Sequence, residues 1–166
     1  MRRLYPKQPL VGIGAVIVRS NRILLEKRGN QPGKGKWSIP GGLVELGEET
    51  KQTVIREVKE ETNLTVENPE LIDVVNDVET DENGRIKYHF VIIDYSVRLK
   101  GGRLRALSDA AELRWVRMEE VENYALTKTF HEFFTRNRKQ LEKLTSCRPL
   151  TKRPRQNEFV PTDTAR

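Results

Sequence analysis

The sequence contains a single cysteine, Cys147, among its 166 residues. An internal disulfide is therefore excluded, which fits a reducing compartment. Long hydrophobic runs are also missing, because the longest, Val11–Val18, is too short to span a bilayer and holds two glycines. Arg2 and Arg3 are not followed by the apolar core of a secretory leader, so we predict no signal peptide. These absences predict a cytoplasmic protein with no membrane partner.

The predicted folded body also lacks an excess of positive charge, which a nucleic-acid-binding surface would need. The net charge is +6, but residues 1–7 and residues 147–166 each carry +3, so residues 8–146 are formally neutral. A nucleic-acid-binding domain usually carries a basic face on its folded body. We therefore predict no nucleic-acid partner. Residues 8–146 are expected to form one domain, followed by a basic, flexible tail at 147–166.

Apolar patterning and turn residues predict an α/β fold. Turn signals such as Asp81–Gly84 separate extended stretches, while the period becomes helical in two places. Two helices packed on a mixed β-sheet would make an α/β sandwich. The expected elements are a hairpin (Val11–Val18 with Ile23–Lys27), a short strand (Lys36–Ile39), a helix (Thr50–Thr62), three strands (Leu64–Glu79, Ile86–Leu99, Glu112–Arg117) and a closing helix from Thr127 to about Leu144.

The first predicted helix has an apolar side and an acidic side. On a helical wheel its apolar arc comprises Val54, Ile55, Val58 and Thr62. A second arc of roughly 100° holds Glu57, Glu60 and Glu61, which are neighbours at helical spacing and repel one another. A hard divalent cation reverses that repulsion, because Mg²⁺ and Mn²⁺ prefer oxygen ligands.

A solvated acidic face on a surface helix is the competing interpretation of these glutamates. The residues before the helix favour the metal site instead. Gly41 and Gly42 permit a phosphate or another chain segment to approach the backbone closely. Arg56 can pair with Glu48 and thereby fix the loop on the helix.

The spacing of these residues resembles the signature of the Nudix hydrolases, and every charged position of the family pattern is filled. Asn63 stands where the family usually has glycine, and asparagine is the next-best residue for a left-handed helix end. Flanking similarity extends from about Gly12 to Trp115. The matching residues are Gly42, Glu48, Arg56, Glu57, Val58, Glu60, Glu61 and Leu64.

The resemblance implies a Nudix-type α/β/α sandwich that hydrolyses a nucleoside diphosphate linked to another moiety. By similarity, Glu57, Glu60 and Glu61 would hold Mg²⁺, with Mn²⁺ as a substitute, and Glu48 and Arg56 would brace the loop. A metal-activated water would attack phosphorus. ADP-ribose, cleaved to AMP and ribose 5-phosphate, is the first substrate expected.

Two alternatives stay open at this point. One is a nucleotide-pool hydrolase that releases pyrophosphate from ordinary or oxidised nucleoside triphosphates. The other, from a different class, is a non-catalytic Nudix domain that senses nucleotides. The catalytic base is equally open, with Glu57 as one candidate and Glu112 as another. Similar enzymes are often dimers, so a homodimer is a further possibility.

Residues outside the signature each allow two interpretations. Arg28 ends the second predicted strand and either reaches the substrate phosphates, with Gly41 and Gly42, or is a solvated strand-end arginine. Trp37 either stacks on a base or belongs to the core. Tyr88 and Phe90 share one strand face and either line a nucleoside pocket or pack in the core.

Overall fold

The structure, a computed structural model, describes residues 3–108 and 110–146. Each strand and helix predicted within this range is present, with ends that differ by at most a few residues. The predicted basic tail, residues 147–166, lies outside the described residues. The elements are β1 (Leu10–Arg19), β2 (Arg22–Arg28), β3 (Trp37–Ser38), α1 (Thr50–Thr62), β4 (Leu64–Thr80), β5 (Ile86–Gly102), β6 (Ala110–Arg117), the 3₁₀ helix η1 (Met118–Asn123) and α2 (Lys128–Ser146).

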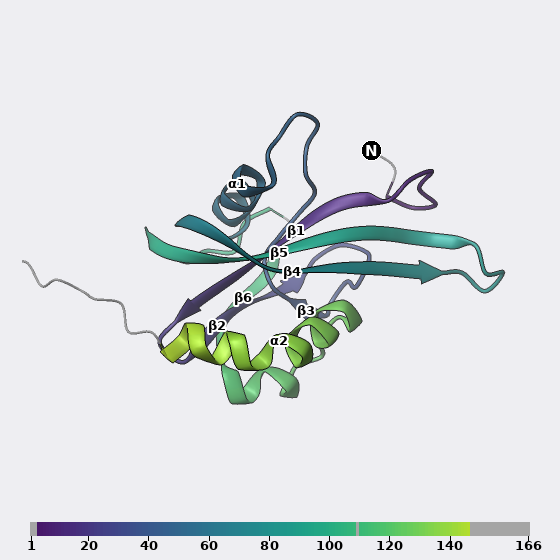
Figure 1. The fold of residues 1–166 in the computed structure, drawn as a ribbon. Coiled ribbons are helices and arrows are strands. Elements are labelled where there is room, and N and C mark those ends of the chain that lie inside the picture. Colours follow the sequence, from purple (N-terminus) through teal and green to yellow (C-terminus); the bar gives the residue numbers. More distant parts are fainter. Residues whose placement is uncertain (1–2, 109, 147–166) are drawn as a thin grey trace, which may run out of the picture.

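A six-stranded mixed sheet forms the middle layer, in the order β3-β2-β1-β5-β4, with β6 paired to β2. β1 and β5 run parallel, and the other neighbouring strands are antiparallel. α1 lies on one face of the sheet and α2 on the other (Figure 1). This arrangement confirms the predicted α/β/α sandwich. Among the described residues, no helix combines the length and apolarity needed to cross a membrane.

The hairpin of β1 and β2 opens soon after its turn, and this opening positions the functional site. The two strands pair at two positions beside the turn, after which β1 pairs with β5 and β2 with β6. The glycine segment (residues 40–44) lies along the edge of β1 that is left open. The amide of Ala15 donates to the carbonyl of Pro40 at 2.8 Å, and that of Ile13 to the carbonyl of Gly42 at 2.8 Å. The glycine segment is thereby fixed against the sheet.

Each helix buries an apolar face against its own side of the sheet. On the α1 side, Val54 and Val58 pack among residues of β1, β4 and β5. The prediction that Ile55 shares this buried face is wrong, because its side chain is 38% exposed. Ile55 lies about 100° around the helix from Val54, which turns it toward solvent. On the α2 side the buried residues of the helix are Phe130, Phe133, Phe134 and Leu141.

Asn63 ends α1 in the left-handed conformation, with φ of 59° and ψ of 10°. Its amide donates to the carbonyl of Lys59 at 3.1 Å, and its side chain donates to the carbonyl of Arg103 at 3.0 Å. The helix-ending role predicted from the sequence is therefore confirmed.

The conformation of Asn63 makes its replacement by alanine costly. We expect Asn63→Ala to lower the free energy of unfolding by about 1–2 kcal/mol, since a Cβ without a local hydrogen bond disfavours positive φ. Asn63→Gly, which adopts the same φ freely, should lie closer to the wild type. Urea denaturation of the three proteins measures the difference, and equal stability of the alanine and glycine variants would contradict it.

Candidate active site

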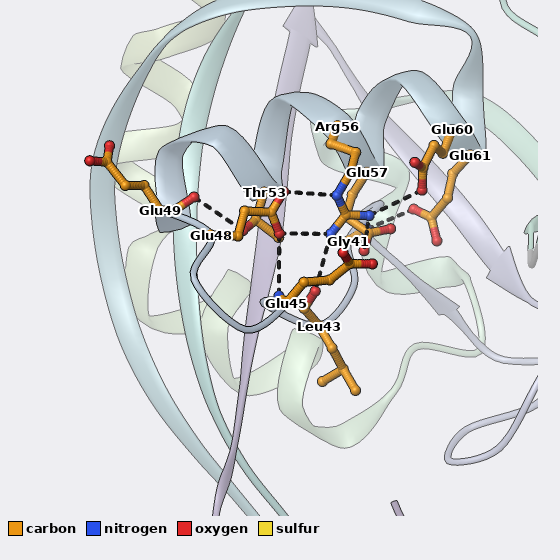
Figure 2. Close-up of polar contacts among 10 residues, drawn as sticks. All are labelled: Gly41, Leu43, Glu45, Glu48, Glu49, Thr53, Arg56, Glu57, Glu60 and Glu61. Carbon is orange, nitrogen blue, oxygen red and sulfur yellow. Dashed lines mark hydrogen bonds and ion pairs between the residues drawn. The ribbon is translucent and has the colours of Figure 1, made fainter. Parts of the chain in front are cut away.

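Arg56 on α1 fixes the loop that precedes its own helix. Its Nε and Nη2 donate to the two carboxylate oxygens of Glu48 at 2.8 and 3.0 Å, and Nη2 also reaches the carbonyl of Leu43 at 3.3 Å (Figure 2). These hydrogen bonds lower the pKa of Glu48 to about 2. Two parallel bonds from one guanidinium fix direction as well as distance. The predicted bracing pair is therefore present, and it holds the loop on the helix.

The two glycines of the glycine segment allow glutamates of α1 to approach the backbone. The amide of Gly41 donates to Oε2 of Glu61 at 2.8 Å. A Cβ on Gly41 would meet the carbonyl oxygen of Ile13 at 2.1 Å, and a Cβ on Gly42 would meet Oε1 of Glu57 at 2.1 Å. Side chains at these positions would push the segment away from β1 and α1. Gly41 is thus required by the closeness of β1, and Gly42 by the closeness of Glu57.

The three predicted ligands of α1 differ in their surroundings. Nη1 of Arg56 contacts Oε1 of Glu57 at 3.0 Å and Oε2 of Glu60 at 3.1 Å. The Glu57 side chain is 13% exposed and that of Glu60 is 53% exposed. Burial raises the pKa of Glu57, while the charge of Arg56 opposes the change. Glu61 is buried and lies farther toward the sheet, at Gly41.

Glu26 is a member of the site that the sequence reasoning missed. It lies on β2, is buried, and lines the same cavity as Glu57 and Glu61. Burial and then the charge and hydrogen bond of Glu26 raise the pKa of Glu61 well above its usual range. The available signal was an acid at the end of the apolar stretch Ile23–Leu25, where a buried strand was expected. Two buried carboxyl groups therefore lie side by side behind the glycine segment.

A cavity of about 740 Å³ extends from these glutamates between the sheet and the start of α2. Its volume is in the range of small-molecule sites in proteins. β5 contributes Phe90, Ile92 and Asp94 to one wall, and α2 contributes Phe130 and Phe133. The cavity therefore has an acidic end at the glycine segment and an apolar wall beyond it.

The structure places the remaining predicted residues as follows. Arg28 lines the cavity, and its Nε donates to the carbonyl of Pro32 at 2.8 Å. Trp37 belongs to the core, where its ring packs edge-on against Tyr124. Phe90 lines the cavity and stacks on Tyr88, with ring centroids 6.2 Å apart.

Glu112, the second candidate for the base, pairs with Arg114 instead. Its Oε1 lies 2.5 Å from Nε of Arg114, and Glu112 is absent from the described residues that line the cavity. The geometry therefore gives Glu57 a place in the cavity and gives Glu112 none.

The four carboxylates do not form a closed cage around a single point. Across residues 3–108 and 110–146, no group of three or more His, Cys, Asp or Glu side chains is arranged to hold a metal ion. Arg56 lies between Glu57 and Glu60, and Glu61 faces Gly41. The acids nevertheless suit a hard cation in type and charge. Oxygen ligands of this kind, crowded in a partly buried place, are those that Mg²⁺ and Mn²⁺ prefer.

The fold and the loop–helix arrangement are those of the Nudix family, and the chain belongs to it. The sequence model of the NUDIX domain matches residues 8–137. The protein is therefore a Nudix hydrolase, of a family of pyrophosphohydrolases that act on nucleotide substrates.

The chain is similar to relatives of two kinds. An ADP-ribose pyrophosphatase of Methanocaldococcus jannaschii is 37% identical over 123 residues, which cover 74% of this chain and 70% of that protein. A MutT-like protein of Streptomyces ambofaciens is 32% identical over 111 residues, which cover 67% of this chain and 66% of that protein.

Solved structures agree with the fold. A MutT NUDIX hydrolase from Burkholderia pseudomallei superposes with a TM-score of 0.67 at 33% identity, over 76% of this chain and 95% of that one. The NUDIX domain of Shewanella oneidensis NrtR, solved with ADP ribose, gives a TM-score of 0.67 at 22% identity, over 81% of this chain and 90% of that one. At that identity the second likeness concerns the fold alone.

Proposed function

We propose that this Nudix hydrolase cleaves a nucleoside diphosphate linked to another moiety, with ADP-ribose as the first substrate. The observation that carries the proposal is the cavity, which joins an acidic end at Glu57 and Glu61 to an apolar wall at Phe90. A diphosphate with its cation fits the acidic end, and a nucleoside fits the apolar wall. The ADP-ribose pyrophosphatase relative, at 37% identity, supports the choice of substrate.

The donor set fits a divalent cation, and Glu57, Glu60 and Glu61 would hold it. Crowded, half-buried carboxylates repel one another until a cation shares their oxygens. When bound, Mg²⁺ or Mn²⁺ would polarise the phosphoryl group and lower the pKa of a water molecule. Because Arg56 contacts both Glu57 and Glu60, it would keep the two carboxylates directed toward the same place.

The remaining roles follow from position. Water attacks one phosphorus, the bond from that phosphorus to the bridging oxygen breaks, and the bridging oxygen leaves with the other phosphate. Glu57 accepts the proton of the water. Its half-buried place in the cavity favours it over Glu112. Arg28, whose Nε is held by Pro32, would direct its guanidinium at the phosphate oxygens. Gly41 and Gly42 line the same cavity, where the backbone of the glycine segment would lie beside the phosphates.

A panel of substrates tests the proposal. Purified full-length protein with Mg²⁺ should release AMP and ribose 5-phosphate from ADP-ribose, and a chelator should stop the reaction. The same panel includes dGTP and 8-oxo-dGTP, because the MutT-like relative and the MutT structure at 33% identity favour a triphosphate hydrolase as second candidate. Pyrophosphate release from a triphosphate at higher kcat/KM would replace ADP-ribose as the substrate.

Two further measurements address nucleotide sensing and the oligomeric state. Binding of ADP-ribose in calorimetry without turnover of any compound would instead support a nucleotide-sensing domain. Sedimentation of the same protein measures whether it forms the homodimer expected from its resemblance to dimeric enzymes.

A further inference from the structure

Asp94 is a buried acid in the middle of the sheet. It lies on β5, opposite Gly14 of β1 on one side and Asp73 of β4 on the other. Its side chain is 4% exposed, and it lines the cavity. Within residues 3–108 and 110–146 its carboxylate takes part in no hydrogen bond or ion pair, and only the charges of Asp73 and Arg136 act on it. A buried carboxyl group without a protein partner is costly, and it holds no other element in place.

The chain makes space for this carboxyl group. A Cβ on Gly14 would lie 2.2 Å from Oδ1 of Asp94 and 2.9 Å from Cδ1 of Ile39. A Cβ added to Gly41 would lie only 3.1 Å from the Cα of Gly14, so these two glycines pack closely against each other. Asp94 is therefore held against the backbone of β1, close to the glycine segment. Any larger residue at position 14 would displace its carboxylate.

The surroundings of Asp94 decide what it can recognise. Burial first, and then the charge of Asp73, raise the pKa of Asp94 to about 7, while Arg136 opposes the change. Phosphate oxygens are anionic acceptors, so an ionised Asp94 would repel them. The hydroxyl and amino groups of a nucleoside are neutral donors, and a carboxyl group accepts from them.

The neighbours of Asp94 on its own strand fit the same ligand. Phe90 and Ile92 lie on the same face of β5 at alternate positions, and both line the cavity. They offer an apolar surface to a base or sugar, and Asp94 is the next residue of that row, opposite Gly14 of β1. A ligand that covers this row would meet two apolar side chains and then one unpaired carboxyl group.

We propose that Asp94 is a specificity-determining residue that receives a hydrogen bond from a neutral donor of the substrate's nucleoside. The donor is a ribose hydroxyl or a base amino group. This assignment rests on the proposed function, because it concerns the cavity in which the diphosphate substrate would bind.

The test compares Asp94→Leu, Asp94→Asn and Asp73→Asn with the wild type, using ADP-ribose and Mg²⁺. Leucine has a similar size but cannot accept a hydrogen bond, so Asp94→Leu should raise KM about 10- to 100-fold with a much smaller change in kcat. Asparagine keeps an acceptor oxygen, so Asp94→Asn should recover most of the affinity. Asp73→Asn is the matched control, because Asp73 shares the sheet face but pairs with Arg136 outside the cavity lining.

Substrate analogues identify the donor. Three analogues remove one donor each: one lacks the 2′-hydroxyl of the adenosine, one lacks its 3′-hydroxyl, and one carries unsubstituted purine in place of adenine. The wild type should discriminate against one of them, and Asp94→Leu should lose that discrimination. Equal KM for wild type and Asp94→Leu, or unchanged discrimination, would overturn the assignment.

The test stays decisive if the proposed function fails. If the wild type turns over none of the substrates, calorimetry with AMP as the probe compares the wild type and Asp94→Leu directly. Weaker AMP binding by the variant supports the role of Asp94, and equal binding or no binding to the wild type refutes it. Thermal unfolding checks that Asp94→Leu is folded, which is expected because the substitution removes a buried unpaired acid.

Discussion

Glu57→Gln is expected to reduce kcat for ADP-ribose by at least about a hundredfold, because the carboxylate is the proposed proton acceptor and a proposed cation ligand. Glutamine keeps the shape of the side chain, and its amide oxygen can still accept from Arg56. The fold should therefore persist, with a melting temperature close to that of the wild type. Initial rates of AMP release at saturating Mg²⁺ measure the effect.

Glu49→Gln is the matched control for the loss of one negative charge. Glu49 precedes α1, is exposed, and its side chain points away from the glutamate cluster (Figure 2). Its substitution should leave kcat within about twofold of the wild type, as usual for an exposed surface position. Equal losses in Glu49→Gln and Glu57→Gln would contradict the special role of Glu57.

Gly42→Ala tests the same carboxylate without changing it. A Cβ on Gly42 would lie 2.1 Å from Oε1 and 2.2 Å from Cδ of Glu57, so the side chain must leave its place beside the glycine segment. Activity should fall as in Glu57→Gln. A fully active, folded Gly42→Ala protein would show that the observed position of Glu57 is not needed for catalysis.

Local patterns made α1 and its cap predictable from the sequence. The valines of α1, the pair of Glu48 and Arg56, and the left-handed Asn63 all depend on residues close to one another in the chain. The types and spacing of these side chains were therefore enough to predict the helix, its bracing pair and its end. Ile55 was placed wrongly in the buried face. A helical wheel shows which residues lie on the same side of the helix, but the position of the sheet decides how many of them are buried.

The parts that could not be predicted depend on which strands lie beside one another. Glu26 comes to Glu61 because β2 leaves β1 after the turn and passes behind the glycine segment. Asp94 enters the cavity because β5 pairs in parallel with β1, so that it faces Gly14. Neither neighbour can be read from spacing along the chain. Both residues are acids within otherwise apolar strands, which is a signal of function only once burial is known.

Asp94→Asn is expected to stabilise the folded protein more as the pH rises. The folded pKa of Asp94 is about 7, against a usual value of 3.8, so between these values the folded state binds more protons than the unfolded state. The stability of the wild type therefore falls as pH rises through this range, and the full penalty is present above about pH 7. Its size is on the order of 4 kcal/mol, from about 1.4 kcal/mol for each pKa unit. Asparagine carries no such penalty at any pH.

Asp73→Asn gives a control of opposite sign in the same measurement. Burial alone would raise the pKa of Asp73. Hydrogen bonds from Asn137 and Arg136 outweigh burial and lower this pKa below its usual value. Asp73 therefore stabilises the folded state at neutral pH and loses this contribution as pH falls through its folded pKa. Urea denaturation at about pH 5 and about pH 8 should show Asp94→Asn gaining stability relative to wild type at the higher pH. Asp73→Asn should be less stable than wild type at about pH 5, where Asp94 is protonated and only the interactions of Asp73 are lost. A pH-independent difference between Asp94→Asn and wild type would mean that Asp94 titrates alike in the folded and unfolded states, and that its burial imposes no charge penalty.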